Sequence, residues 1–549
     1  SRHLVRRKLS VETRLTGILD ALKLKRLHLS LPDELDFDAS GEVRAVTTPA
    51  RTAGKLSFEG RLGRSPWVAS LLPAGIVLPP LTLRGEAEAV KGEYRGSLHL
   101  RTVEGSVAAQ GSFRADDQHY TADLQVDSLA LFRFLPADSL GYVTLTARAE
   151  GQGFDPYAPT TAGQVDLRIA QAEYKGFDYR AIALTAELAE SRLVGRLTSD
   201  NEGLGADLSL HGLLTAQRQE ASVAGLLSRL DLERLRLTPT PASASGRIAL
   251  QASATDSGSY AARVELDSLQ IRYGTFTNSV ARTVLSAEAS PHRVMAEAAS
   301  GDLRLTFRSA VGIDSLVAGF DRTVAQIQHQ IQVGDIDADT LSRLLPPFRM
   351  EFRAARNNLL YSFLRAREMG FGQAKLTAHA GPEEPFDFRA EVNRFSTQGL
   401  VLDTLTAGVG NREGALRYFA RLANRAGNRN RIGLIALSGH AAGRSAQLSL
   451  AQRDCQGRQG GNFGLRATLA DSSVTVNLLP QRPVFGFAEW TVNDGNYVRY
   501  GFPDRTLEAD LRVERAGQSF TLQSIEAEDL PSGSLRLGVA GIDIGGVLR

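Results

Sequence analysis

The sequence has a single cysteine, Cys455, which excludes an intramolecular disulfide framework and any cysteine-rich metal cage. One thiol fits a cytosolic protein as well as an envelope protein, so it does not decide the compartment. No stretch approaches the roughly 18 consecutive apolar residues of a membrane-spanning helix. An excess of one charge is also missing, because 63 Lys and Arg face 61 Asp and Glu. The arginines are spread singly, so we expect no nucleic-acid partner.

Catalytic motifs are equally scarce. The nine histidines are scattered and form no HExxH or HxxxH pair, so a zinc hydrolase has no support. There is no GxSxG elbow and no Walker loop. The glycine-rich residues 457–464 lack the GxGxxG spacing and lie between strand-like runs, which favours a long hairpin loop over a phosphate site. Cys455 has no histidine nearby. We therefore expect no enzyme, no catalytic residue and no cofactor.

Three alternating aspartates, Asp335, Asp337 and Asp339, resemble part of a calcium loop. The central glycine and the later ligands of an EF-hand are absent. Aspartate at the start of a helix has a capping role of its own. We interpret this segment as a helix start and predict no metal site.

The dominant pattern is alternation: apolar residues recur at every second position, which places them on one side of a β-strand. Short segments rich in Gly, Asn, Asp and Ser separate these runs, as at residues 199–203 and 255–259, and suit hairpin turns. No helices alternate with the strands, so a parallel α/β sheet is excluded. The apolar positions of the clearest runs are the candidate binding residues: Ile182, Leu184, Leu188, Leu208, Leu210, Leu303, Leu305, Phe307, Phe386, Phe388, Leu535 and Leu537.

The fold class predicted from this pattern is all-β, a long and mostly antiparallel curled sheet with a few short helices that plug or brace it. Because the pattern continues without a convincing linker, we expect one continuous elongated groove over residues 1–549. Strands of roughly 8 to 10 residues with their turns would give about 50 strands. The start lacks Met and a signal peptide, and the last residues follow a strand-like run, so we interpret the sequence as an interior fragment of a longer chain.

Two degenerate repeats accompany the alternation. Asp-Ser-Leu follows an apolar residue at 126–129, 266–269 and 313–316, and residues 402–406 (Leu-Asp-Thr-Leu-Thr) are a fourth variant. A leucine-rich stretch ending in proline occurs at 70–73, 133–136 and 343–346, where proline ends one or two helical turns. The clearest helices are expected at residues 337–345 and 358–365. Such recurrence favours an extended repeat architecture.

The apolar strand faces admit two interpretations. They could pair with one another into compact sandwiches and disappear into cores. Aromatic residues, however, make up only 7% of the chain, so the large side chains that usually join sandwich cores are few. A continuous surface of Leu, Val, Ala and Ile would instead solvate acyl chains, at about 0.8 kcal/mol per buried methylene.

Residues 474–480 (Val-Thr-Val-Asn-Leu-Leu-Pro), the Pro-Val-Phe at 483–485 and residues 489–497 (Glu-Trp-Thr-Val-Asn-Asp-Gly-Asn-Tyr) resemble the TamB family of AsmA-like envelope proteins. The resemblance implies a β-taco groove that moves phospholipid between the inner and outer membranes of a Gram-negative envelope and supports outer-membrane biogenesis. It further implies a periplasmic location, and an Omp85-type outer-membrane barrel that docks through a C-terminal region beyond this sequence. An N-terminal anchor, also beyond it, would hold the parent protein in the inner membrane.

Two rival functions remain. A periplasmic assembly factor could template or escort outer-membrane β-barrel proteins through exposed strand edges. A secreted β-solenoid adhesin would need regular repeats with outward Asn or Gly ladders, which this sequence lacks.

Overall fold

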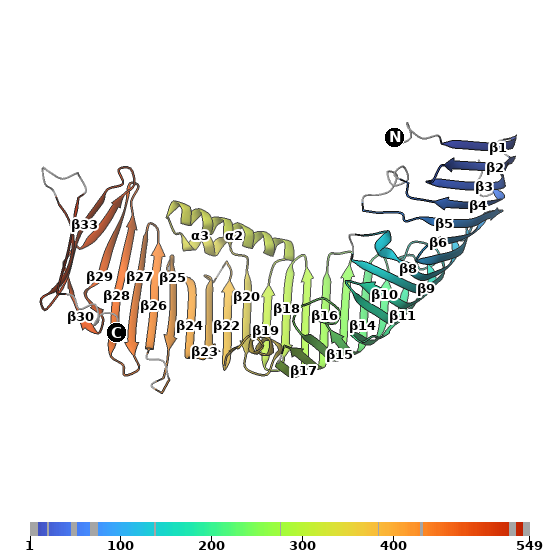
Figure 1. Ribbon diagram of the computed structural model, residues 1–549. Helices are drawn as coiled ribbons and strands as arrows, with labels where there is room; N and C mark the ends of the chain where they lie inside the picture. Colours follow the sequence, from blue (N-terminus) through green and yellow to red (C-terminus); the bar gives the residue numbers. More distant parts are fainter. Residues whose placement is uncertain are drawn as a thin grey trace. The chain divides into compact units, whose positions relative to one another are not determined.

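The computed structural model describes residues 9–18, 21–45, 52–65, 75–136, 139–274, 276–382, 384–425, 427–428, 432–525 and 534–541. Within them the chain forms 35 named strands and few helices, and every ladder is antiparallel (Figure 1). This confirms the predicted all-β class with a long antiparallel sheet. The chain divides into two compact units, Ser1–Ser279 and Val280–Arg549. One continuous groove over the whole chain stays a prediction.

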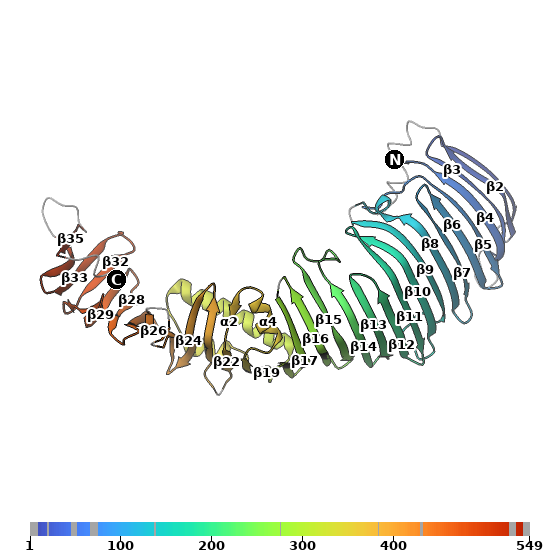
Figure 2. The same ribbon diagram turned by 60° about the horizontal axis from the view of Figure 1, so that its bottom comes forward.

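The first unit is a succession of hairpins in which each described strand pairs with the next along the chain (Figures 1 and 2). Its strands are β1 (Ser10–Ile18), β2 (Ala21–Leu31), β3 (Leu35–Arg44), β4 (Ala53–Leu62), β5 (Leu81–Val90), β6 (Glu93–Thr102), β7 (Gly105–Arg114), β8 (His119–Ala130), β9 (Leu140–Gln152), β10 (Ala162–Tyr174), β11 (Phe177–Ala189), β12 (Arg192–Asp200), β13 (Leu204–Leu214), β14 (Arg218–Asp231), β15 (Ala242–Thr255) and β16 (Tyr260–Tyr273). The boundary between the units falls within β17 (Phe276–Ser290).

The second unit continues the hairpin pattern and adds helices. Its further strands are β18 (Arg293–Ser300), β19 (Leu303–Ser309), β20 (Phe348–Ala354), β21 (Met369–Gly370), β22 (Gln373–Ala380), β23 (Asp387–Thr397), β24 (Leu400–Arg412), β25 (Ala415–Ala423), β26 (Ile432–Ala442), β27 (Ser445–Asp454), β28 (Gln459–Leu469), β29 (Ser473–Phe485), β30 (Ala488–Glu489), β31 (Thr491–Val492), β32 (Tyr497–Gly501), β33 (Leu507–Arg515), β34 (Gln518–Ser524) and β35 (Leu535–Ala540). Its helices are α2 (Ile313–Val333), α3 (Ala338–Leu344) and α4 (Leu359–Arg365).

The strands are longer and fewer than expected. β14, β15 and β16 have 14 residues each, and β17 has 15. The estimate of about 50 strands was therefore too high, because it assumed only 8 to 10 residues for a strand together with its turn.

The Asp-Ser-Leu repeat marks a β-bulge. Ser128 and Ser268 both have positive φ, 49° and 53°. Val126 and Leu129 lie opposite Leu145 and Val143, so two residues of β8, Asp127 and Ser128, match the single Thr144 of β9. The extra residue returns Leu129 to the side of the sheet that carries Val126, where both are buried. The motif thus keeps an apolar residue on the same face across an irregularity in the strand.

The two predicted helices are confirmed, and so is the predicted aspartate cap of the first. Asp337 precedes α3, and its Oδ1 accepts a hydrogen bond from the Thr340 backbone N–H at 2.9 Å. Asn358 precedes α4 in the same way, with 2.8 Å to the Tyr361 N–H. The proline-terminated run at 133–136 begins at the last residue of a short 3₁₀ helix, η3 (Leu131–Arg133). The copy at residues 70–73 lies outside the described residues.

The longest helix was not predicted. Residues 313–316 were grouped with the strand repeats, yet they form the first turn of the 21-residue α2. The later run from Ile327 to Val333 alternates apolar and polar residues like a strand, which hid the helical period. The expectation of short helices alone was therefore wrong here.

Substitution of Ser128 will test the bulge. Left-handed backbone costs an L-residue about 1–2 kcal/mol, and β-branched side chains tolerate it least. We expect Ser128→Val to lower the local stability of β8 and β9 by about 2 kcal/mol and Ser128→Gly to leave it within about 1 kcal/mol. Hydrogen exchange of β8 and β9 measures the difference. Equal effects of both variants would contradict the assignment, and Ser268 offers an independent copy.

Candidate functional site

A single row of directly paired apolar residues crosses the first unit. It takes one residue from each strand from β2 to β16, and every member is aliphatic, aromatic or glycine. The row is Leu27, Ala39, Phe58, Gly85, Leu98, Ala109, Leu124, Ala147, Leu167, Leu184, Leu197, Leu208, Gly225, Ile248 and Leu266. We call the side of a unit's sheet that carries such rows its apolar face.

Three parallel rows widen this face, through Val126, Ala122 and Tyr120 on β8. From β2 to β14 these three rows consist of aliphatic residues, glycines, phenylalanines and two tyrosines, Tyr94 and Tyr120. The one further polar residue in them is Ser199. Ser199 is buried, and its Oγ donates to the Leu204 carbonyl at 2.7 Å, so its polar group is satisfied locally. Four rows at every second residue span about 20 Å along the strands.

No second layer covers most of this face among the described residues. Large side chains on it remain substantially exposed, with Leu98 at 37%, Val165 at 40% and Leu250 at 39%. The accessible area of the chain is 33439 Å², against about 19,000 Å² for a compact protein of this mass. All described strands also belong to one hydrogen-bonded sheet rather than to two packed sheets. The sandwich alternative is therefore wrong.

The opposite face is polar and carries cross-strand ion pairs. Arg196 contacts Asp207 at 2.7 Å, and Arg148 contacts Asp123 at 3.1 Å. The hydrogen bond from Arg196 holds the pKa of the Asp207 carboxyl below its ordinary value. These pairs are exposed and contribute little each. The contrast between the two faces gives the sheet one wetted side and one apolar side.

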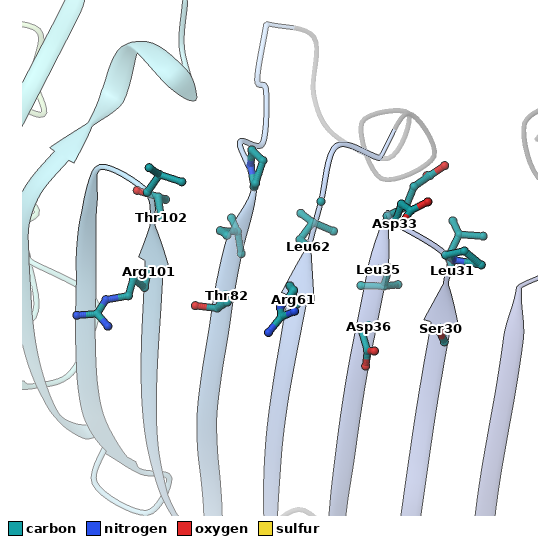
Figure 3. Close-up of a pocket in the computed structure, with 16 residues that line it drawn as sticks. Ser30, Leu31, Asp33, Leu35, Asp36, Arg61, Leu62, Thr82, Arg101 and Thr102 are labelled. Carbon is teal, nitrogen blue, oxygen red and sulfur yellow. The ribbon is translucent and has the colours of Figure 1, made fainter.

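Buried leucines gather at one end of the strands in the first unit. Leu31, Leu62 and Leu81 are buried there at exposures of 2%, 7% and 5%. Figure 3 shows the hollow that these strand ends border, with a volume of about 660 Å³. Arg61 of β4 and Arg101 of β6 line it from the two strands that flank β5, so its lining is mixed rather than apolar.

The other end of the strands carries aromatic residues. Tyr94 stacks on Phe113 with ring centroids 6.4 Å apart, and Tyr120 stacks on Phe154 at 5.4 Å. Phe154 itself is 64% exposed. Aromatic rings with a polar tip suit a border between an apolar surface and water.

The second unit has an apolar face of the same construction. Its central row crosses β17 to β20 and β22 to β28, and consists of Leu285, Ala298, Leu305, Phe352, Leu376, Ala390, Ala407, Ala420, Leu437, Leu450 and Phe463. A second row contains Phe307 and Phe388. Leu285 in the first row is 43% exposed.

Two local clusters cover parts of this second face. Leu341 of α3 packs with Phe348 and Phe386 near one end of the strands. Trp490, which lies between the short strands β30 and β31, and Val492 of β31 pack with Val513 of β33. A helix at residues 337–345 that braces the sheet was predicted from the sequence, whereas the cover provided by Trp490 was missed, although Trp490 lies in the run that resembles the TamB family. Sequence alternation alone does not show which segment folds over a face.

The structure places the candidate binding residues as follows. Those on β11 and β13 share the apolar face of the first unit, where Leu184 and Leu208 flank Leu197 in the central row. Ile182, Leu188 and Leu210 each lie in one of the three parallel rows.

In the second unit, Leu303, Leu305 and Phe307 alternate on β19, and Phe388 belongs to the same row as Phe307. Phe386 is already packed under α3. Leu535 and Leu537 lie on β35, where Leu537 pairs with Leu522 and is 64% exposed. Their placement follows from the alternation; a role in lipid binding stays a prediction.

The polar candidates resolve into structural roles. Residues 457–464 form a short turn followed by the start of β28, so the expected long loop is shorter. A side chain at Gly460 would meet the Phe487 ring at 3.0 Å, which explains one of its glycines. Asp337 caps α3, and Asp339 accepts from the Asn411 amide at 2.7 Å.

A histidine and two aspartates meet on the polar face of β2 and β3. His28 Nδ1 lies 3.1 Å from Asp38 Oδ1 and 3.9 Å from Asp36 Oδ1. Partial desolvation raises the pKa of Asp38, but hydrogen bonds from His28 and Arg26 outweigh it and leave that pKa lowered. Within the described residues this is the one group with metal-ligand geometry, and the nearby Arg26 cation opposes an ion there.

No family model matches this chain, and neither does any curated protein or solved structure. Among the described helices, none combines the length and apolarity needed to cross a bilayer.

Close packing on the apolar face can be tested at Gly85. A Cβ there would meet the Phe58 ring at 2.3 Å and the Ser97 carbonyl oxygen at 2.7 Å. We expect Gly85→Ala to displace this ring and to reduce the stability of β4 to β6 by about 1–3 kcal/mol. Hydrogen exchange of these strands reports the change.

Gly96 is the matched control, because a Cβ there would meet only the Glu86 oxygen, at 3.6 Å. Gly96→Ala should be neutral or stabilising by up to about 1 kcal/mol. Equal losses for both variants would show that the ring contact is unimportant.

Proposed function

We propose that the chain is a non-enzymatic conduit for phospholipid, whose acyl chains lie on the apolar faces while the headgroups stay in water. The observation that carries the proposal is the row from Leu27 to Leu266, which crosses 15 strands without a charged or amide side chain. By resemblance to the TamB family, the setting is the periplasm of a Gram-negative envelope and the role is outer-membrane biogenesis.

The area of the apolar face in the first unit supports the proposal that a ligand covers it. Fifteen strands at about 4.8 Å and a width of about 20 Å give roughly 1,400 Å² in the first unit. The largest apolar patch on a typical soluble monomer is about 300–600 Å². A surface this much larger, left partly exposed, fits a protein whose apolar face is covered by something other than its own chain.

The dimensions fit an acyl chain. One bilayer leaflet has a hydrocarbon thickness of about 15 Å, close to the roughly 20 Å that four rows span along a strand. A chain lying along the strands would leave its headgroup at the end of the strands. Each buried methylene contributes about 0.8 kcal/mol, and an equivalent position follows about every 4.8 Å. A lipid can therefore move between similar positions without chemistry.

Acidic substitutions on the apolar face test the proposal. We expect Leu184→Asp combined with Leu208→Asp to reduce phospholipid co-purification and vesicle-to-vesicle transfer by roughly tenfold or more. The loss of two or three methylene contacts at about 0.8 kcal/mol each exceeds the 1.4 kcal/mol that corresponds to tenfold. Unchanged lipid binding would refute the conduit.

Thr185→Asp combined with Ser209→Asp is the matched control, because both residues lie on the polar face opposite Arg196. This variant should transfer lipid normally. The rival function, escort of outer-membrane β-barrel proteins through strand edges, predicts a different result. It would leave barrel assembly intact in the apolar-face variant and sensitive only to changes at a sheet edge.

A further inference from the structure

Helix α2 carries more apolar surface than its packing uses. Leu316 and Gly319 are buried, and a Cβ on Gly319 would contact the Pro346 ring at 3.0 Å, so this side of α2 rests on the segment that follows α3. Val324, Ile327 and Ile331 are nevertheless 53%, 40% and 67% exposed. A helix packed on one side would normally present polar residues at such positions.

Phe320 fixes the direction of this exposed surface. Its ring lies 5.5 Å from the ring of Phe348, which belongs to the cluster on the apolar face of the second unit. At roughly 100° per residue, Val324, Ile327 and Ile331 leave α2 within about 40° of Phe320. These three side chains, which we call the α2 stripe, therefore extend from the side of the helix that meets the apolar face.

The helix is held in place rather than hinged. The Gln330 side chain donates to the Asp337 carbonyl at 3.1 Å and accepts from the Asp337 N–H at 3.2 Å. Ile336 and Gly443 exchange backbone hydrogen bonds of 2.8 Å, which ties the end of α2 to the β26–β27 turn. α2 is about 30 Å long and runs beside the strand ends (Figure 1). It is a fixed wall and not a lid.

We infer that the α2 stripe and the apolar face of the second unit form the two walls of a binding slot for a phospholipid acyl chain. This inference rests on the proposed function and adds a specific subsite to it. The occupant follows from continuity and chemistry. The stripe continues the apolar cluster around Phe348 and offers no hydrogen-bonding or charged group, so a saturated hydrocarbon chain satisfies it fully. An open sheet would shield an acyl chain on one side, whereas the slot shields it on two.

Site-specific photo-crosslinking tests the slot. A benzophenone amino acid is placed at Val324 or Ile331 in the full chain, with Ala325 and Gln332 as adjacent controls. The controls are also exposed, but they leave the helix about 120–140° away from Phe320. The probe is radiolabelled phosphatidylethanolamine in vesicles with phosphatidylglycerol. We expect several-fold more labelled protein from the stripe positions than from the controls.

A probe at Leu184, in the first unit, separates the two proposals. Labelling at Leu184 with equal labelling of stripe and control positions overturns the slot and leaves the conduit standing. Labelling of the stripe but not of Leu184 supports the slot and counts against the conduit, and no labelling anywhere refutes both. If an added soluble protein segment, but not unlabelled lipid, reduces labelling of the stripe, the stripe binds a protein partner and the inference is overturned.

Discussion

The structure depends on one constraint: across every hairpin, the apolar residues of consecutive strands must stay on the same face of the sheet. In an antiparallel pair the side chains alternate with a period of two, so a slip of one residue would move a whole strand's apolar set to the wetted side. From Leu27 to Leu266 no such inversion occurs. Where a strand gains a residue, as at Ser128 and Ser268, the bulge returns the following apolar residues to the same face. The apolar face is thus the sum of local register choices, and a single uncompensated insertion would divide it.

This constraint also explains how much the sequence could predict. Alternation at Ile182, Leu184, Leu208 and Leu210 is a local property, and antiparallel pairing of consecutive strands converts it directly into a shared face. The acidic start at Asp337 and the apolar residues of both runs were equally local signals, so α3 and α4 could be placed. The bulge function of Asp-Ser-Leu was visible as a repeat but not as a conformation, because its meaning depends on the register of the neighbouring strand.

The elements that were missed are those whose structure does not follow from the alternation of apolar residues in consecutive strands. α2 begins with residues that match a strand repeat and ends with an alternating run, and only its packing on Pro346 and Phe348 distinguishes it from a strand. Trp490 covers its face through a chain reversal between β29 and β32 that no periodicity encodes. Coverage of a sheet is a tertiary property, so sequence patterns can locate an apolar face without showing which parts of it remain open.

A sheet with an uncovered apolar face must obtain its stability differently from a globular domain. Its strands are held by ladder hydrogen bonds and cross-strand contacts, each with its nearest neighbours, as in repeat proteins. Stability therefore does not require the apolar face to be buried, and the face is available to a ligand. A ligand that binds only the folded sheet also stabilises it by mass action. In such a protein, the surface that would be an aggregation hazard when bare becomes a source of stability when it carries hydrocarbon.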